Sequence, residues 1–178
     1  MNARNLSLGG LLAALLSGCG GGSDGNGICR SIANGGASTS ATARSGATIN
    51  NGSAVFDGRL SSAATLTPSL ATLSGATLRG TLGSGTASGA FAGLVLSGLD
   101  ERQTITVSIS TYLDGVLVES GQAGIQTGTS QACGGICVTQ DGDSFFGIAT
   151  SRAYDAIGAS IDLTGATQPL QLRELCVR

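Results

Sequence analysis

The clearest periodic segment of the chain covers residues 104–111, where Thr and Ser alternate with Ile and Val. A repeat of two residues places apolar side chains on one face and hydroxyl groups on the other, which predicts a strand with one buried face. Asp114-Gly115 follows, and then the run Val116-Leu117-Val118-Glu119. Asp-Gly favours the type I′ turn of a two-residue hairpin, because both central residues need a positive φ. The pattern therefore predicts a β-hairpin whose turn is Asp114-Gly115.

Five further segments have the length and apolar content of strands. They are separated by Gly-rich or polar turns and cover residues 76–82, 90–97, 144–150, 157–163 and 170–177. Beyond residue 27, no segment combines a long 3.6-residue apolar period with helix caps. Short strands at this spacing are typical of two packed antiparallel sheets. We therefore expect an all-β fold, an antiparallel β-sandwich of jelly-roll type, as a single domain over residues 28–178.

The amino-terminal residues have a different pattern. One cation, Arg4, precedes an apolar stretch over residues 6–16, which ends at Leu16-Ser17-Gly18-Cys19. The stretch is shorter than the roughly 20 residues of a membrane-spanning helix, so it predicts a signal peptide that is removed. Leu16-Ser17-Gly18-Cys19 resembles the lipobox of bacterial lipoproteins. In that family the cysteine thiol receives a diacylglyceryl group and the chain is cut just before the cysteine.

This resemblance implies a signal peptide over residues 1–18, a lipid on Cys19 and a Gly-rich, flexible tether over residues 19–27. The membrane is then the expected partner, through the lipid anchor. The alternative is an ordinary secretory signal that leaves Cys19 free for a disulfide. The chain has five cysteines, and lipidation of Cys19 leaves an even number, which favours the anchor. Gly20 rather than Asp after Cys19 implies, by the same resemblance, the outer membrane of the bacterial cell envelope.

The remaining cysteines are Cys29, Cys133, Cys137 and Cys176. A chain sent to an oxidising compartment uses such cysteines for disulfides more often than for zinc. Three pairings are open. We favour Cys29 with Cys176, which ties the two ends of the domain, and Cys133 with Cys137 across Gly-Gly-Ile.

The composition excludes several classes of function. Charged residues make up 11% of the chain, where about 25% is ordinary. The formal net charge is −2 and no basic stripe with interleaved aromatics occurs, so we expect no nucleic-acid partner. The chain has no His, which excludes Ser-His-Asp and Cys-His sites. A carboxylate pair drawn from Glu119, Asp141 and Asp143 remains conceivable for glycoside hydrolysis. With so few charges to draw on, we predict that the protein is not an enzyme.

Residues 50–66, with Asp57-Gly58 and the closing Ala64-Thr65-Leu66, resemble a segment of discoidin-like, galactose-binding-like β-sandwich modules of secreted bacterial surface proteins. Segments 108–120, 145–147, 154–157 and 170–177 fit the same modules, so the likeness extends over most of residues 50–178. It implies a jelly-roll sandwich that serves as an adhesive or carbohydrate-binding unit.

The same resemblance implies a structural calcium ion near Asp57-Gly58 as the one expected cofactor. Arg59 departs from the pattern where many modules have a second acid or amide, and it removes both a ligand and favourable charge. The alternative is a plain turn in which the Asp57 side chain bonds its own backbone, and we favour it. For Asp141-Gly142-Asp143 we likewise favour a solvated turn over a cation site.

The function expected from these features is a non-catalytic binding module on a membrane-anchored lipoprotein of the cell envelope, for carbohydrate or another envelope component. Tyr112 lies near the predicted hairpin turn and is our first candidate ligand contact, although a packing role is the more common one for such a residue. Phe145 and Phe146 are adjacent in a strand, so one is expected in the core and the other is free to be exposed. The alternative function is a structural or protein-interaction lipoprotein without a glycan ligand.

Overall fold

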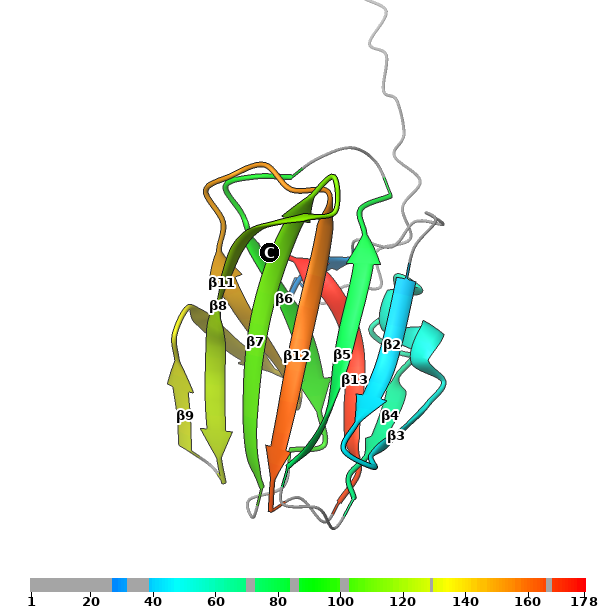
Figure 1. Ribbon diagram of the computed structural model, residues 1–178. Coiled ribbons are helices and arrows are strands. Elements are labelled where there is room, and N and C mark those ends of the chain that lie inside the picture. Colours follow the sequence, from blue (N-terminus) through cyan, green and yellow to red (C-terminus); the bar gives the residue numbers. More distant parts are fainter. Residues whose placement is uncertain are drawn as a thin grey trace, which may run out of the picture.

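The described residues of the computed structural model are 27–31, 39–69, 73–83, 87–99, 103–128, 130–165 and 168–178. They form two antiparallel β-sheets that face each other (Figure 1). The predicted β-sandwich is therefore confirmed. The signal peptide, the lipobox with Cys19 and the tether up to residue 26 lie outside the described residues. Within the described part of the chain, no helix is long and apolar enough to cross a membrane.

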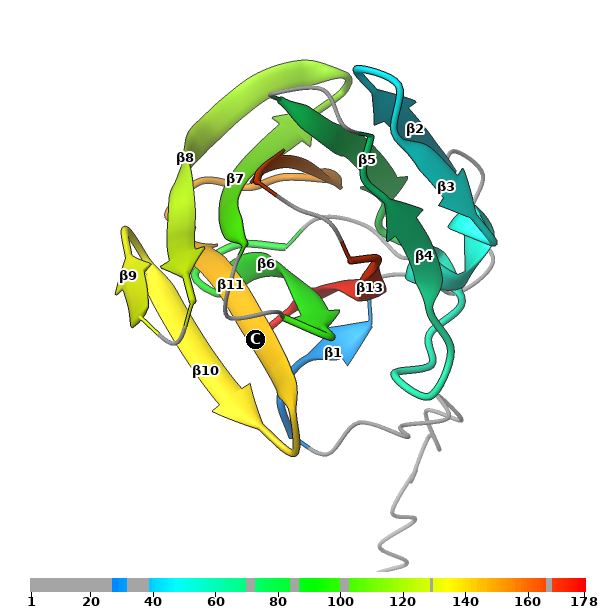
Figure 2. The same cartoon turned by 90° about the horizontal axis from the view of Figure 1, so that it is seen from below.

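Each sheet is built from strands that are distant in sequence. Sheet A has the order β10 (Ile136–Gln140), β11 (Asp143–Ala149), β6 (Phe91–Ser97), β13 (Leu170–Val177), β4 (Ala64–Thr67) and β3 (Thr48–Asn50), with β1 (Arg30–Ser31) also paired to β13. Sheet B has the order β2 (Thr39–Arg44), β5 (Ser74–Thr81), β12 (Ala156–Thr164), β7 (Thr104–Leu113), β8 (Val116–Thr127) and β9 (Ser130–Cys133). A short 3₁₀ helix, η1 (Gly52–Phe56), precedes β4. The chain repeatedly crosses between the sheets, as in a jelly roll (Figure 2).

All the segments predicted as strands are strands. The hairpin between β7 and β8 turns at Asp114 and Gly115, whose φ angles are 51° and 80°. Both values are positive, as a type I′ turn requires. We call the end of the sandwich that carries this turn the hairpin end, which is uppermost in Figure 1, and the end where β8 finishes the distal end. The sequence analysis did not predict β1, β2, β3, β4, β9 or β10.

The core lies between the two sheets and follows the alternation of the strands. In β7 the apolar side chains point inward and are buried, while the Thr and Ser side chains between them point outward. Phe146 from β11 and Tyr154 before β12 are fully buried in the same core. The main apolar members from the two sheets are Leu66, Leu78, Leu94, Leu96, Val107, Ile109, Ile157, Ile161, Leu172 and Leu175.

A second, smaller apolar cluster lies on the outer face of sheet A. Phe145 points away from the main core, yet its exposure is 0%. It packs with Ile28, Val95 and Cys176, and Leu60 lies against the same cluster. The expectation that one of the two adjacent phenylalanines is free to be exposed is therefore wrong. The amino-terminal residues of the domain fold back over sheet A and cover the outward-facing ring.

Both favoured disulfides are present, with Cα atoms 5.9 Å apart in each. Cys29–Cys176 fixes the start of the domain to the last strand, beside the pairing of β1 with β13. Cys133–Cys137 joins the end of β9 in sheet B to β10 in sheet A. The second bond therefore closes one side of the sandwich.

Candidate functional site

An open hollow of about 420 Å³ lies at the distal end, between the ends of β8 and β9 in sheet B and of β10 and β11 in sheet A. Its described lining contains amide and hydroxyl groups, one apolar side chain and two glycines, and none of these residues is charged. They are Gly98, Leu99, Gln126, Gln131, Thr139, Gly142 and Ser144. The volume falls within the roughly 300–1,000 Å³ of small-molecule sites.

The polar lining residues occupy positions that are apolar elsewhere in the sandwich. Gln126 pairs with the buried Ile105, and Ser144 pairs with the buried Leu96. Directly paired residues of antiparallel strands point to the same face of their sheet. Gln131, which pairs with Gln126, and Thr139, which pairs with Ser144, therefore also face the space between the sheets. At the distal end that space is lined by polar groups and left open rather than filled by the core.

A β-bulge turns Gln126 inward. The pairing of β7 with β8 shifts between Val107 and Ser108, so Ala123 is the extra residue in β8. Before the shift Gln122 pairs with Ser108 on the outer face, and after it Gly124 pairs with the core residue Val107. A bulge of this kind redirects the side chains that follow it. Without it, Gln122 and Gln126 would lie on the same face.

Two glycines allow the chain to cross between the sheets beside the hollow. A Cβ atom on Gly134 would collide with the carbonyl oxygen of Gln122, and one on Gly135 with that of Gly147. The crossing therefore passes tightly between β8 and β11, and the disulfide Cys133–Cys137 holds it there. Within the hollow, the hydroxyl groups of Thr139 and Ser144 are 3.1 Å apart, and the Gln126 amide donates to the Gly128 carbonyl at 3.1 Å.

Tyr112, the candidate contact from the sequence, lies elsewhere. It is half-buried on the outer face of sheet B near the hairpin end, and it is not part of the core between the sheets. A Cβ atom on Gly158 would lie 3.1 Å from its ring, and the Arg79 guanidinium carbon is 4.0 Å from the ring centroid. This cation–π contact fixes the tyrosine against its own sheet. Tyr112 and the hollow therefore lie toward opposite ends of the sandwich.

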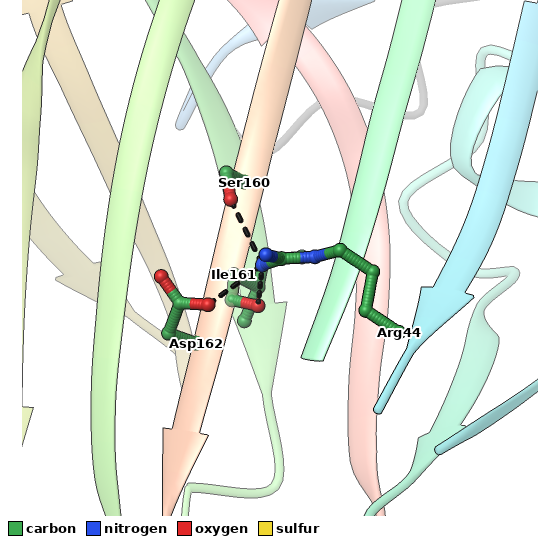
Figure 3. A network of polar contacts seen from close by, with 4 residues as sticks. All are labelled: Arg44, Ser160, Ile161 and Asp162. Atoms are coloured by element: carbon green, nitrogen blue, oxygen red, sulfur yellow. Dashed lines mark hydrogen bonds and ion pairs between the residues drawn. The ribbon is translucent and has the colours of Figure 1, made fainter. Parts of the chain in front are cut away.

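The rest of the outer face of sheet B is hydroxylated. One row across five strands consists of Thr42, Thr77, Ser160, Ser108 and Gln122. At its β2 edge, the guanidinium of Arg44 crosses β5 and donates to Asp162 at 2.6 Å, to Ser160 and to the Ile161 carbonyl (Figure 3). The ion pair is partly exposed, so it contributes at most about 1 kcal/mol and mainly fixes the edge strand.

Asp57 forms a turn with its own loop. Its Oδ1 accepts the N–H of Arg59 at 2.9 Å, and its Oδ2 accepts the hydroxyl of Ser62 at 2.7 Å. Gly58 has a φ of 80°, as a tight turn here requires. These bonds form the side-chain turn that we favoured over calcium. Among the described residues, no group of three or more His, Cys, Asp or Glu is placed to hold a metal ion. Calcium at Asp57 stays a prediction.

Glu119 is separated from the other two carboxylates considered for hydrolysis, Asp141 and Asp143. Asp141 and Gly142 form the turn between β10 and β11 at the distal end, with φ angles of 52° and 85°, as favoured from the sequence. Asp143 lies 3.4 Å from the Nε of Arg173. Glu119 contacts Ser151, beyond the other end of β11. The seven residues of β11 span about 20 Å. Glu119 therefore cannot act with Asp141 or Asp143, because paired glycosidase carboxylates lie within roughly 10 Å of each other.

Glu119 has a structural role at the hairpin end. Its carboxylate accepts the Ser151 hydroxyl at 2.6 Å and the Ser151 N–H at 3.2 Å. The hydroxyl bond is the main cause that lowers the pKa of Glu119 below its ordinary value of 4.5; partial desolvation opposes it, and backbone N–H groups and the charge of Arg152 lower the pKa further. The ionised carboxylate thus ties β8 to the segment after β11.

This bond predicts a specific dependence of stability on pH. The folded-state pKa of Glu119 is lowered, so its charge stabilises the fold above about pH 4.5 and this contribution is lost as the pH falls further. We expect the Tm of wild-type protein to be higher than that of the Glu119→Gln variant at pH 6, and this difference in Tm to disappear toward pH 3. Thermal unfolding across this range checks the prediction. A difference in Tm that does not change with pH would show that the charge of Glu119 does not contribute to stability.

Comparison with known proteins gives the following. No protein-family model and no curated protein matches the chain. Three solved structures are similar. The enzymatically active domain of bacteriophage CBA120 tailspike protein 4 has a TM-score of 0.47 and 13% identity, over 79% of this chain and 19% of that one. The CBM32 module of AlyQ, in complex with 4,5-unsaturated mannuronic acid, has a TM-score of 0.44 and 18% identity, over 78% of this chain and 93% of that one. TmCBM61, in complex with β-1,4-galactotriose, has a TM-score of 0.38 and 11% identity, over 79% of this chain and 87% of that one.

The chain thus spans about a fifth of the tailspike domain and most of each of the two modules. All three TM-scores are below 0.5.

Proposed function

We propose that this chain is a lipoprotein anchored to the bacterial envelope through Cys19, and that its β-sandwich is a non-catalytic module that binds a neutral saccharide in the distal hollow. The observation that carries the proposal is the set of uncharged polar groups facing inward around an open space at the edge of the core. By the lipobox resemblance, the outer membrane is the proposed location.

The chemistry of the hollow suits a sugar. The amides of Gln126 and Gln131 offer hydrogen-bond donors and acceptors, and the hydroxyl groups of Thr139 and Ser144 can donate or accept. A saccharide presents the same mixture of groups around its ring. Leu99 adds an apolar surface against which the C–H face of a sugar can pack. Because the described lining carries no charge, a neutral sugar fits better than a uronic acid.

The ligand test is a thermal-unfolding titration of the mature lipoprotein in mild detergent with neutral and acidic oligosaccharides. A ligand at a hundred times its Kd adds about 2.7 kcal/mol of stability, which raises the Tm of a domain of this size by several degrees. We expect saturable shifts with neutral sugars and weaker shifts with acidic ones. No shift with any saccharide would contradict the proposal, and a stoichiometric envelope protein captured instead would favour the protein-interaction alternative.

Two glutamines of β8 supply a matched pair of variants. Gln126 faces the hollow, while Gln122 lies four residues earlier on the outer face. We expect Gln126→Ala to weaken saccharide binding about tenfold, since one or two hydrogen bonds are each worth about 1 kcal/mol. Gln122→Ala should leave the affinity unchanged. Equal losses in both variants would place the ligand elsewhere.

A further inference from the structure

Two large apolar side chains are exposed just after the turn at the hairpin end. Val116 is 68% exposed and Leu117 is 55% exposed. Leu117 pairs across the hairpin with Tyr112, whose ring is stacked with Arg79. Antiparallel partners share a face, so leucine, tyrosine and arginine form one corner on the outer side of sheet B. Val116 pairs with Leu113 and therefore lies on the other side of the hairpin, directly at its tip. We call Arg79, Tyr112, Leu117 and the neighbouring Val116 the hairpin corner.

The amino-terminal end of the domain lies at the same end of the sandwich. The guanidinium of Arg178 donates to the carbonyls of Gly27 and Ile28 at 3.1 and 2.7 Å. The backbone of Arg178 pairs with Phe91, at the start of β6. Figure 2 shows β1 beside β13.

Further contacts at this same end of the sandwich connect sheet A to sheet B. Thr150 pairs with Ala90, directly before β6, and the next residue, Ser151, bonds Glu119 in β8. Glu119 is only two residues from Leu117. The chain therefore enters the domain at the end that carries the hairpin corner.

The hollow lies at the other end of the sandwich, farther from the point where the chain enters. The eight steps from Cys19 to Gly27 span at most about 28 Å, whatever their conformation. The twelve residues of β8, which run from the hairpin end to the hollow, span about 40 Å. The tether therefore places the hairpin corner within reach of the bilayer, at the end of the sandwich where the chain enters.

The residue types of the hairpin corner suit the bilayer interface. Tyrosine is enriched there because it has an apolar ring and a polar tip, and arginine reaches phosphate groups while its stem lies on apolar surface. Leucine and valine add apolar area. Asp114 also lies at the turn and is exposed, which favours contact at headgroup depth over deeper insertion.

We infer that the hairpin corner rests on the surface of the phospholipid bilayer and holds the hollow pointing away from it. This inference rests on the proposed lipid anchor at Cys19, and it adds a second, non-covalent membrane contact that sets the orientation of the domain. The partner is the lipid surface itself. The saccharide would then be met on the side away from the anchoring membrane.

The chain has no tryptophan, so a single introduced one reports its own surroundings. Two variants at opposite ends of β8 are compared as mature lipoproteins in liposomes, with ordinary or bromine-labelled phospholipids. They are Leu117→Trp in the hairpin corner and the control Thr127→Trp at the distal end, and both sites are exposed. We expect a blue-shifted emission and a roughly twofold loss of fluorescence in brominated liposomes for Leu117→Trp alone, because tryptophan settles at the lipid interface.

Flotation of the same samples separates this inference from the anchor. Protein that floats with the liposomes, while Leu117→Trp is quenched no more than Thr127→Trp, would overturn the orientation and leave the anchor standing. Equal quenching of both variants would also overturn it. Wild-type protein that does not float would overturn the anchor, and the orientation with it.

Discussion

Replacing Cys29 and Cys176 together with alanine is expected to lower the free energy of unfolding by about 5 kcal/mol. The bond joins residues 147 positions apart, so its loss releases nearly the whole domain in the unfolded state. In the chain-entropy model the penalty grows with the logarithm of that separation. For a domain of this size we expect the Tm to fall by roughly 10–20 °C, and differential scanning calorimetry measures it.

The second disulfide supplies the control. Cys133 and Cys137 are four positions apart, so Cys133→Ala/Cys137→Ala should cost only about 2 kcal/mol. If the two double variants lose equal stability, the entropy account of the long bond is wrong.

Loss of the long disulfide also has a local consequence. Ile28 is 1% exposed and covers Phe145, and Cys176 lies in the same cluster. Once Cys29 is released, the described contacts that still retain the amino-terminal residues are the packing of Ile28, the short pairing of β1 with β13 and the bonds from Arg178. We therefore expect increased proteolysis near residue 28 in the alanine variant. This cluster explains why the outer face of sheet A is apolar at Phe145.

The strands that were predicted are those with a local signal. In residues 104–110 the apolar–polar alternation agrees with the burial, and the turn residues Asp114 and Gly115 follow shortly after, so sequence alone suffices. The Asp141-Gly142 turn carries the same signal as Asp114-Gly115 and has the same positive φ angles. It closes a second hairpin, between β10 and β11, which was not predicted because the strand before the turn was not recognised. That segment, Ile136–Gln140, is half-exposed and lacks a regular alternation of apolar and polar residues.

The hollow could not be predicted from the sequence. Its position depends on the bulge at Ala123, after which the side chains of β8 point to the opposite faces of the sheet. The pattern of apolar and polar residues in the sequence does not reveal this bulge. It also depends on the pairing of strands distant in sequence, since Gly98 and Gln126 meet only through the packing of the two sheets. The burial of Phe145 was missed for a similar reason, because its cover comes from residues more than a hundred positions away.

The packing of Phe146 against β8 provides the second large expected effect. Phe146, which comes from sheet A, is fully buried. A Cβ atom added to Gly124 in sheet B would lie only 2.6 Å from Cδ1 of the Phe146 ring. The glycine thus leaves room for the ring between the sheets. Phe146→Ala removes the ring from a packed interior and is expected to cost about 3–5 kcal/mol, measured by urea denaturation.

The two positions should be strongly coupled. Gly124→Ala alone forces the ring to move and should cost about 1–3 kcal/mol by overpacking. In the Phe146→Ala background the same methyl group enters the space that the ring has left, so most of its cost should vanish, and a close approach to the Cys137 sulfur at 3.1 Å remains. Residues in contact that share a cavity commonly couple by about 0.5–3 kcal/mol. Additive effects in this double-mutant cycle would mean that the ring does not occupy the space above Gly124. Coupling would instead show that this glycine is kept small to admit a side chain from the opposite sheet, next to the strand that carries Gln126 into the hollow.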